Sequence, residues 1–419
     1  MNYLQTRREF LRWGLKGASL MATTSFVPSF LTQSLLAEED QAFWQKSPER
    51  IMVVIQLAGG NDGLNTIIPY TNDLYYKARP LIAQKKETIL KINDDLGFHQ
   101  SLEGFKKLYD SGKLSVVQGV GYPNPDRSHF RSMDIWHGGI DPHVHSETGW
   151  LGRYFDAQCG GADLPAATIG MNLGKIFPNA FRNAHSLGVS LEDPESYLWE
   201  PSGTSKAFVE AQQSIFEELN RPQMEADPSL SFLQHTGMNA QISSQEVRSA
   251  VKKYRSKVSY PAGKLGESLS LIARMMSGGL GTRVYYAHQG GFDTHNDQNG
   301  RHDRLLRELG ESCLAFQTDL EQIGIADRVV TLVFSEFGRR VQENASGGTD
   351  HGAAAPLFVF GKGIKGGLQG ETPSLSDLVD GDLKFGTDFR QVYATVLDRW
   401  MKVPSDSILQ RDFKKLGFI

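Results

Sequence analysis

The sequence contains few cysteines and little net charge, and each shortage excludes a class of protein. Only Cys159 and Cys313 occur among the 419 residues, so at most one disulfide can form. This excludes a disulfide scaffold and a cysteine-rich metal module, and two free buried thiols are expected. Lys and Arg number 44 against 48 Asp and Glu, a formal charge of −4, which implies no broad surface for nucleic acid.

Residues 17–37 carry no charge at all, and they follow the segment TRREFLR at residues 6–12. Two adjacent arginines before Phe-Leu resemble a twin-arginine export signal. Seven of the 21 uncharged residues are Ser or Thr and Pro28 interrupts them, so no stable membrane span is expected. We predict that residues 1–37 are a signal peptide read by the twin-arginine export machinery. The mature chain, residues 38–419, would then be periplasmic or secreted.

Short apolar runs rich in β-branched residues recur along the mature chain and end in glycine-rich loops. Such runs predict buried, mostly parallel strands, and helical spacing between them predicts right-handed βαβ units. The predicted strands are residues 51–57, 114–120, 283–287, 329–334 and 356–361, and the predicted helices are residues 102–108, 301–323 and 389–400. The pattern indicates an α/β fold with a doubly wound, mostly parallel sheet.

Residues 160–260 differ from the rest because they are polar, prone to helix and poor in strand signals. Helices are expected over residues 208–219 and 246–258. We interpret this segment as a helical insertion or lid in a single α/β domain, where it would influence the choice of substrate.

Metal-binding or nucleophilic side chains collect where the predicted strands end. In open α/β sheets, ligand sites lie beyond the carboxyl ends of the strands. An Asp in a glycine-rich turn usually only stabilises that turn. Five such clusters at equivalent positions, however, indicate a ligand site. Carboxylate and imidazole ligands suit one or two divalent ions such as Zn, Mn, Ca or Fe. The clusters are Asp62, Ser128 with His129, Asp293 with His295, Glu336, and Asp350 with His351.

Ser128 stands where a helix is expected to begin, within PNPDRSHFRSMDIW at residues 123–136. A hydroxyl at a helix N-terminus lies where backbone N–H groups and the helix dipole favour an anion, and Arg127 and Arg131 add positive charge. Ser128 is therefore either a plain N-cap, a role that Asp126 could also fill, or a nucleophile whose alkoxide a metal stabilises.

Three further histidines, His137, His143 and His145, lie close together in WHGGIDPHVH. A solvated loop is the favoured interpretation, and binding of metal or substrate at a rim is the alternative.

Five motifs resemble the exported bacterial family called domain of unknown function 1501, over nearly the whole mature chain. This family is similar to the alkaline-phosphatase-like superfamily, which includes phosphatases, sulfatases and cofactor-independent phosphoglycerate mutases. The resemblance implies an alkaline-phosphatase-like fold. The motifs are QLAGGNDGLN at residues 56–65, residues 123–136, GGFDTH at 290–295, TLVFSEFGR at 331–339 and TDHG at 349–352.

The resemblance also implies roles for site residues. Asp62 would bind one metal and Ser128 would be the nucleophile. Asp293 with His295 would bind a second metal, which His351 completes. One departure affects this second set, because the superfamily usually places its His four residues after the Asp, where this chain has Asp297.

A second departure affects the first metal. Glu336 matches the expected Asp, but Phe337 replaces the expected His. One position then keeps only oxygen ligands, from Asp62, Ser128 and Glu336. The other keeps a mixed set, to which Asp350 beside His351 is a further candidate.

Two functions follow as hypotheses. The first is an exported, metal-dependent hydrolase of small anionic phosphate or sulfate esters, in which Ser128 attacks and arginines clamp the oxygens. The alternative, favoured by Phe337, is a non-catalytic periplasmic binding or partner protein on a degenerate scaffold. The candidate clamps are Arg127, Arg131, Arg339 and Arg340.

Overall fold

A computed structural model describes residues 50–158, 167–184, 187–195, 205–219 and 243–419. The chain divides into residues 1–48 and residues 49–419, and only the second unit is described. The predicted signal peptide and Cys159 therefore lie outside the described residues. Cys313 is a buried free thiol. Among the described residues, no helix is both long enough and apolar enough to cross a membrane.

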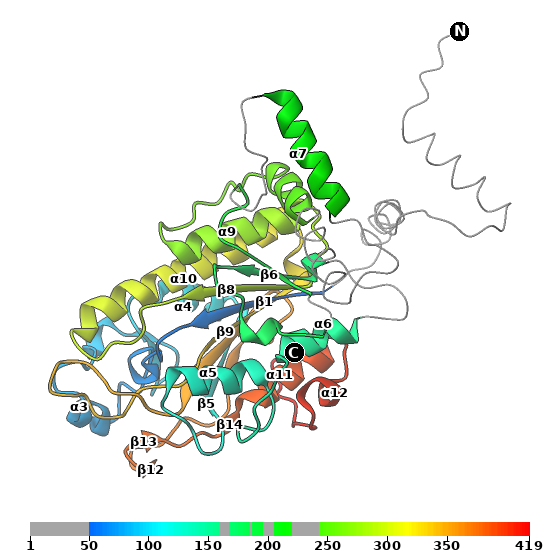
Figure 1. Cartoon of the computed structure of the whole chain (residues 1–419). Helices are drawn as coiled ribbons and strands as arrows, with labels where there is room; N and C mark the ends of the chain where they lie inside the picture. Colours follow the sequence, from blue (N-terminus) through cyan, green and yellow to red (C-terminus); the bar gives the residue numbers. More distant parts are fainter. Residues whose placement is uncertain (1–49, 159–166, 185–186, 196–204, 220–242) are drawn as a thin grey trace, which may run out of the picture. The chain divides into compact units, whose positions relative to one another are not determined.

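The described residues form a central sheet of nine strands (Figure 1). Only β10 (Ala355–Phe360) runs against its neighbours in this sheet. The order is β11-β5-β10-β9-β1-β8-β6-β7, with β14 also paired to β5. The strands are β1 (Ile51–Leu57), β5 (Leu114–Gly121), β6 (Gly170–Leu173), β7 (Val189–Leu191), β8 (Val284–Gln289), β9 (Val329–Ser335), β10 (Ala355–Phe360), β11 (Gly367–Gln369) and β14 (Thr387–Asp388).

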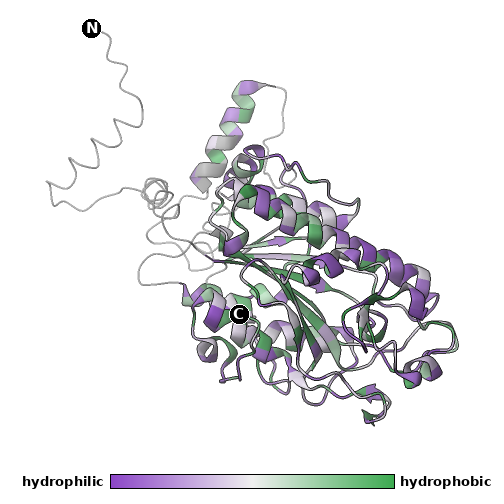
Figure 2. Ribbon diagram, turned by 180° about the vertical axis from the view of Figure 1, so that it is seen from behind, coloured by the Kyte–Doolittle hydropathy of each residue, from purple (hydrophilic) through white to green (hydrophobic). Residues whose placement is uncertain are grey.

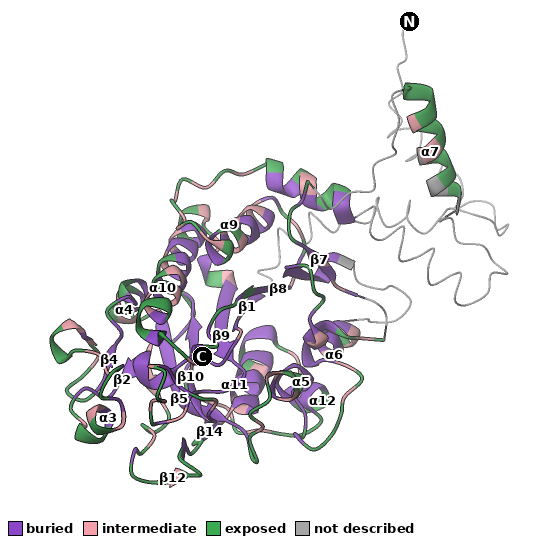
Figure 3. Ribbon diagram, turned by 60° about the vertical axis from the view of Figure 1, so that its left-hand side comes forward, coloured by how far each residue is buried: buried purple, intermediate pink, exposed green. Residues whose placement is uncertain are grey.

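Helices cover both faces of this sheet, so its central strands are buried on both sides, as Figure 3 shows. In β1, Val53 and Ile55 pack on one face, while Met52 and Val54 pack on the other. Strands buried on both faces read as continuous apolar runs, which is why the central strands are mostly green in Figure 2. One face carries α4 (Glu103–Asp110), α9 (Lys264–Ser277) and α10 (Gln298–Ile323), and the other carries α5 (His129–Gly138), α6 (Trp150–Ala157), α11 (Phe389–Thr395) and α12 (Ser405–Leu409).

Smaller elements complete the described part. A three-stranded sheet has the order β2-β4-β3, and β12 pairs with β13 in a hairpin. The helix α11 continues as a π-helical segment, η6 (Val396–Met401), and residues 243–252 are also helical. The remaining bounds are β2 (Ile67–Ile68), β3 (Leu90–Lys91), β4 (Gly97–Phe98), β12 (Leu378–Val379), β13 (Asp382–Leu383), α3 (Asp73–Ala78), α7 (Lys206–Leu219), η1 (Gly63–Asn65), η2 (Lys86–Thr88), η3 (Ala167–Ile169), η4 (Asn179–Phe181) and η5 (Ala326–Arg328).

The doubly wound, mostly parallel α/β sheet predicted from the sequence is confirmed. One expectation needs correction, because residues 160–260 are not purely helical. This segment supplies β6 and β7, which extend the sheet beyond β8. Both strands are short, four and three residues, and such short runs give almost no periodic signal.

The topology brings distant loops to one edge of the sheet. The strands β1, β5, β8 and β9 share one direction, so their carboxyl ends lie together, and the antiparallel β10 begins at that same edge. Side chains that follow these four strands or precede β10 are therefore neighbours, as expected for a ligand site in an open α/β sheet.

Candidate metal centre

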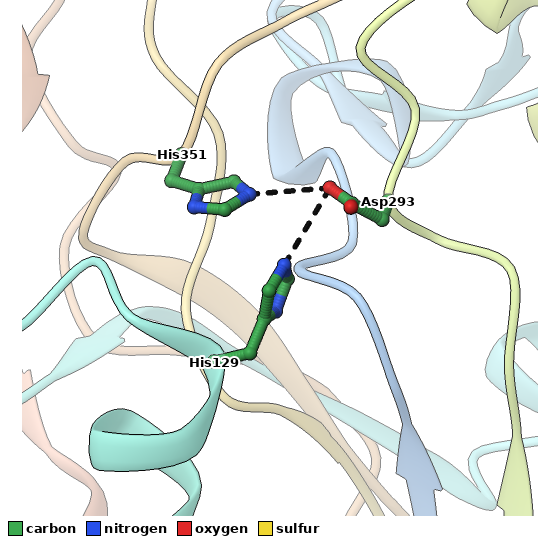
Figure 4. Close-up of side chains that lie close together, drawn as sticks. All are labelled: His129, Asp293 and His351. Carbon is green, nitrogen blue, oxygen red and sulfur yellow. Dashed lines mark hydrogen bonds and ion pairs between the residues drawn. The ribbon is translucent and has the colours of Figure 1, made fainter.

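His129, Asp293 and His351 meet at this edge, and one ligand atom of each lies within 4.8 Å of the others (Figure 4). His351 Nε2 is 3.1 Å from Asp293 Oδ1, and His129 Nε2 is 3.6 Å from the same oxygen. The three residues come from the start of α5, the loop after β8 and the loop before β10.

His295 joins the same group. Its Nε2 is 3.1 Å from Asp293 Oδ1 and 3.0 Å from His351 Nε2. Three imidazole nitrogens therefore converge on one carboxylate oxygen. We call His129, Asp293, His295 and His351 the four-residue cluster.

The other ring nitrogen of each histidine is fixed by an oxygen. His129 Nδ1 lies 2.9 Å from Glu336 Oε1, and His295 Nδ1 lies 3.2 Å from Asp350 Oδ1. His351 Nδ1 lies 2.8 Å from the backbone oxygen of Arg127. Because these oxygens only accept hydrogen bonds, each Nδ1 carries the proton, and the Nε2 of a neutral ring keeps a lone pair.

This arrangement fits a bound cation. Two Nε2 lone pairs 3.0 Å apart, on His295 and His351, repel each other unless a positive charge lies between them. Histidines that bind metals usually donate their other N–H to a carboxylate or a carbonyl, as all three do here. Imidazole and carboxylate ligands are those of Zn, Mn and Fe, whereas Ca²⁺ prefers sets of oxygen ligands only.

Charges around Asp293 keep its carboxylate ionised. Burial alone would raise its pKa, but Arg339, through a hydrogen bond (Nη2 to Oδ1, 2.7 Å) and its charge, outweighs burial together with the neighbouring His351 and His295 and lowers the pKa to about 2. The hydrogen bond to Glu336 is the largest cause of a raised pKa of His129. Arg339 is itself buried and also donates to the backbone oxygens of Gly60 and Thr349.

Phe337 forms an apolar wall beside the cluster. Its ring centroid lies 4.9 Å from that of His129 and 4.8 Å from that of His351. Gly60 makes room for this ring, because a Cβ there would clash with Phe337 Cε2, and its φ of +76° disfavours other residues. The phenyl ring thus packs against the histidines and offers no ligand atom.

Asp62, a predicted ligand, is held elsewhere. It forms an ion pair of 2.6 Å with Arg79, and neither side chain is exposed. Gln298 also donates to the carboxylate, and Arg79 donates to the backbone oxygens of Arg340 and Val341. Burial favours a raised pKa for Asp62, but Arg79 overcomes this and the pKa is lowered. The structure does not bring Asp62 into the four-residue cluster.

Two other predicted ligands, Glu336 and Asp350, lie one step behind the cluster. The buried Glu336 accepts from the backbone N–H of Gly59 at 2.8 Å as well as from His129. The exposed Asp350 accepts from Asn344 at 3.2 Å as well as from His295. Both carboxylates orient a histidine.

Asp297 is outside the cluster as well. It occupies the N-cap position of α10 with a φ of +42°, and its backbone N–H donates to Ser346 O at 3.3 Å. Of the two alternatives in this loop, His295 lies in the cluster and Asp297 does not.

Ser128 occupies the N-cap position of α5, but its side chain makes no capping hydrogen bond. Its backbone N–H donates to Asp126 Oδ1 at 2.7 Å, and the residue is exposed beside His129. Arg127 binds Asp382 through Nε at 2.8 Å. Arg131 points to a different loop, where it donates to the backbone oxygen of Pro142.

The neighbouring histidines also lie outside the cluster. His137 is buried on α5, with its Nε2 3.0 Å from Tyr286 Oη, and burial lowers its pKa to about 4. His143 lies 3.3 Å from Asn124 Nδ2, and His145 lies 3.1 Å from Arg131 Nη1. By contrast, the sequence placed His129 with Ser128 in a strand-end cluster but did not include it among the predicted metal ligands.

Comparison with solved structures finds distant likenesses. A sulfatase from Pseudoalteromonas sp., PsFucS1, is 12% identical over 92% of this chain and 76% of that one, with a TM-score of 0.39. A protein in the alkaline phosphatase superfamily from Vibrio parahaemolyticus is 10% identical over 85% of this chain and 69% of that one, with a TM-score of 0.36. An alkaline phosphatase from the Antarctic bacterium TAB5 is 10% identical over 75% and 92%, with a TM-score of 0.28. At these TM-scores the likenesses carry no argument about function.

Comparison with the curated proteins finds no match. A family model does match, over residues 49–410, which is most of the chain and includes the whole four-residue cluster. The chain therefore belongs to the family described as protein of unknown function (DUF1501).

Proposed function

We propose that this protein is an exported, metal-dependent hydrolase of phosphate or sulfate esters. One observation carries the proposal: three Nε2 atoms converge on Asp293 Oδ1, while each Nδ1 is fixed by an oxygen. Such preorganised nitrogen and oxygen donors suit a catalytic divalent ion. Export is the part of the proposal that rests on residues 1–37.

The four-residue cluster would hold one divalent ion, with Zn, Mn or Fe favoured by its three imidazoles. When bound, such an ion stabilises negative charge that develops on an ester oxygen and favours the ionised form of a nucleophile. Asp293 is ready to bind because its pKa lies at about 2, which keeps it ionised at neutral pH.

Ser128 is the proposed nucleophile. It stands at the N-cap of the ten-residue helix α5, one residue before His129, and it is exposed. The positive end of the helix dipole favours an alkoxide and the anionic ester. The preceding residue, Arg127, has a side chain that is 40% exposed and ion-paired with Asp382.

The test combines metal analysis with turnover. The full-length protein, purified without chelator, is analysed for metal and then assayed on aryl phosphate and aryl sulfate esters. We expect about one divalent ion per chain. Ser128→Ala should lower turnover at least about a hundredfold with metal content unchanged, because it removes the nucleophile alone. Ser111→Ala, which changes an exposed serine at the end of α4, is the matched control.

The outcomes separate the two candidate functions. Turnover that survives Ser128→Ala would refute the nucleophile. Stoichiometric metal without turnover of any ester would favour the alternative, a non-catalytic binding or partner protein. That alternative is supported by Phe337, which offers no ligand atom, and by Asp62, whose charge Arg79 already balances. Absence of bound metal would refute the hydrolase.

A further inference from the structure

The buried carboxylate of Asp382 lies between two arginines. Arg127 donates to Asp382 Oδ2 from Nε at 2.8 Å and from Nη2 at 2.5 Å. Arg340 Nε lies 3.8 Å from Asp382 Oδ1. The Asp382 side chain is only 3% exposed, whereas the side chains of Arg127 and Arg340 are 40% and 37% exposed. One buried carboxylate therefore holds two guanidinium groups that reach solvent.

A hairpin fixes the place of Asp382. The strands β12 and β13 pair with Val379 opposite Asp382, which leaves Asp380-Gly381 as a two-residue turn. Both turn residues have positive φ, +52° and +83°, as the common Asp-Gly hairpin turn requires. Leu383 is buried in an apolar cluster with Val341, next to Arg340 in the chain. The turn and this contact together hold Asp382 against the arginines.

Both arginines are tied through their backbones to the four-residue cluster. The backbone oxygen of Arg127 accepts from His351 Nδ1 at 2.8 Å. The backbone N–H of Arg340 donates to the backbone oxygen of Asp350 at 3.0 Å, and the Asp350 side chain in turn orients His295. The backbones of both arginines are therefore tied to the candidate metal centre, and the Arg340 side chain interacts electrostatically with the Asp350 carboxylate, which orients His295.

Among Arg127, Arg340 and Asp382, two guanidinium groups face one carboxylate, an excess of one positive charge. The exposed Asp350 is a further carboxylate within electrostatic range of Arg340. Asp382 Oδ1 is buried without a hydrogen-bond donor among the described residues. The Arg340 side chain donates no hydrogen bond to any of the described residues, so its N–H groups remain available to a ligand. A guanidinium held near a buried carboxylate but not hydrogen-bonded to it is suited to bind an oxyanion.

We propose that Arg127 and Arg340, positioned by Asp382, form an oxyanion subsite for the sulfate or phosphate group of the substrate. This inference rests on the proposed function for its link to substrate. Asp382 is a positioning residue here, because it acts through the two arginines.

Calorimetric titration with inorganic sulfate and inorganic phosphate tests the subsite on the full-length, metal-loaded protein. Arg340→Ala should weaken anion binding about 10–100-fold, because it removes charge-assisted hydrogen bonds. Asp382→Asn separates two roles of the carboxylate. If Asp382 positions the arginines, the affinity of this variant for both anions falls. If the carboxylate only offsets the positive charge of the arginines, that affinity rises. Asp377→Asn, which changes an exposed carboxylate paired with Lys384, is the control and should change nothing.

Two results would overturn the inference: Arg340→Ala binding both anions like the parent protein, or Asp382→Asn binding them more tightly. Thermal denaturation of Asp382→Asn shows whether that variant folds. The partly exposed Arg340 provides a test that does not depend on the folding of Asp382→Asn. Failure of the proposed function is distinguishable. A protein without metal or turnover that still binds sulfate through Arg340 would keep the subsite and lose the hydrolase.

Discussion

Two aspartates at the same edge of the sheet have opposite surroundings. Asp62 follows β1 and Asp293 follows β8, and the two strands are parallel neighbours. The Asp62 side chain is fully buried against Arg79, whereas the Asp293 side chain is 49% exposed and faces three histidines. The residue type and the topological position are the same for both.

The difference lies in what remains open beside an arginine, since each carboxylate contacts a buried guanidinium group. Arg79 pairs with Asp62 at 2.6 Å, and because both side chains are fully enclosed, no face of this carboxylate is left for a metal. Arg339 contacts Asp293 Oδ1 at 2.7 Å, but this carboxylate is half exposed and also faces the Nε2 atoms of three histidines. A carboxylate at a strand end is thus open to metal only where it keeps an exposed face among donor side chains.

Breaking the buried pair should produce the largest effect. Arg79→Met leaves Asp62 buried without its counter-ion, and such losses cost about 3–5 kcal/mol of unfolding free energy. Urea denaturation measures this, and metal content per folded molecule should not fall. Arg301→Met, at an exposed arginine, is the control and should stay within about 0.5 kcal/mol. A stable Arg79→Met protein would show that the pair is not what holds Asp62.

Removing the exposed carboxylate should affect metal rather than folding. Asp293→Ala should weaken divalent metal binding more than about a hundredfold, beyond the 10–100-fold typical of residues that only orient a ligand. Isothermal titration with Zn²⁺ or Mn²⁺ measures the affinity. Asp297→Ala changes a nearby exposed carboxylate outside the cluster and should bind metal normally. Equal losses in both variants would contradict the four-residue cluster.

A smaller effect should distinguish the two regions by pH. Burial lowers the pKa of His302, which belongs to the Asp62 region, to about 3. Below pH 6.5 this histidine binds a proton in the unfolded chain but stays neutral in the folded protein. The free energy of unfolding therefore falls as the pH drops from 6.5 towards 3. His302→Gln should reduce this slope by up to about 1.4 kcal/mol per pH unit.

Urea denaturation at pH 7, 6, 5 and 4 measures that slope. His143→Gln, at an exposed histidine, is the control and should leave it unchanged. Identical slopes in His302→Gln and the parent protein would mean that His302 does not stay neutral on folding.

Much of the sheet was predictable from the sequence because its central strands are buried on both faces. Continuous apolar runs marked β1, β5, β8, β9 and β10. The strand-end rule then indicated that their loops converge. The short strands β6 and β7 were missed, since strands of four and three residues carry too few residues for a pattern.

The site was predictable only to the level of the loops. Sequence order indicates which carboxylates and histidines follow strands, and it placed Asp293, His295 and His351 at one edge. It does not indicate that Arg79, 17 residues after Asp62, turns back to neutralise it, because that contact depends on packing across the loop. The roles of Glu336 and Asp350 behind their histidines depend equally on side-chain orientation, which no spacing reveals.

Because the residues of the four-residue cluster lie far apart in the sequence, the cluster can form only after most of the chain has been made and folded. His129 lies in the first third of the chain and His351 near its end, so no fragment released early in synthesis contains all four donors. They meet only once β5, β8 and β10 have taken their places in the sheet. Any metal bound by this cluster would therefore be acquired by a finished fold. If residues 1–37 direct export as predicted, a protein loaded in the compartment where it was made would cross the membrane already folded.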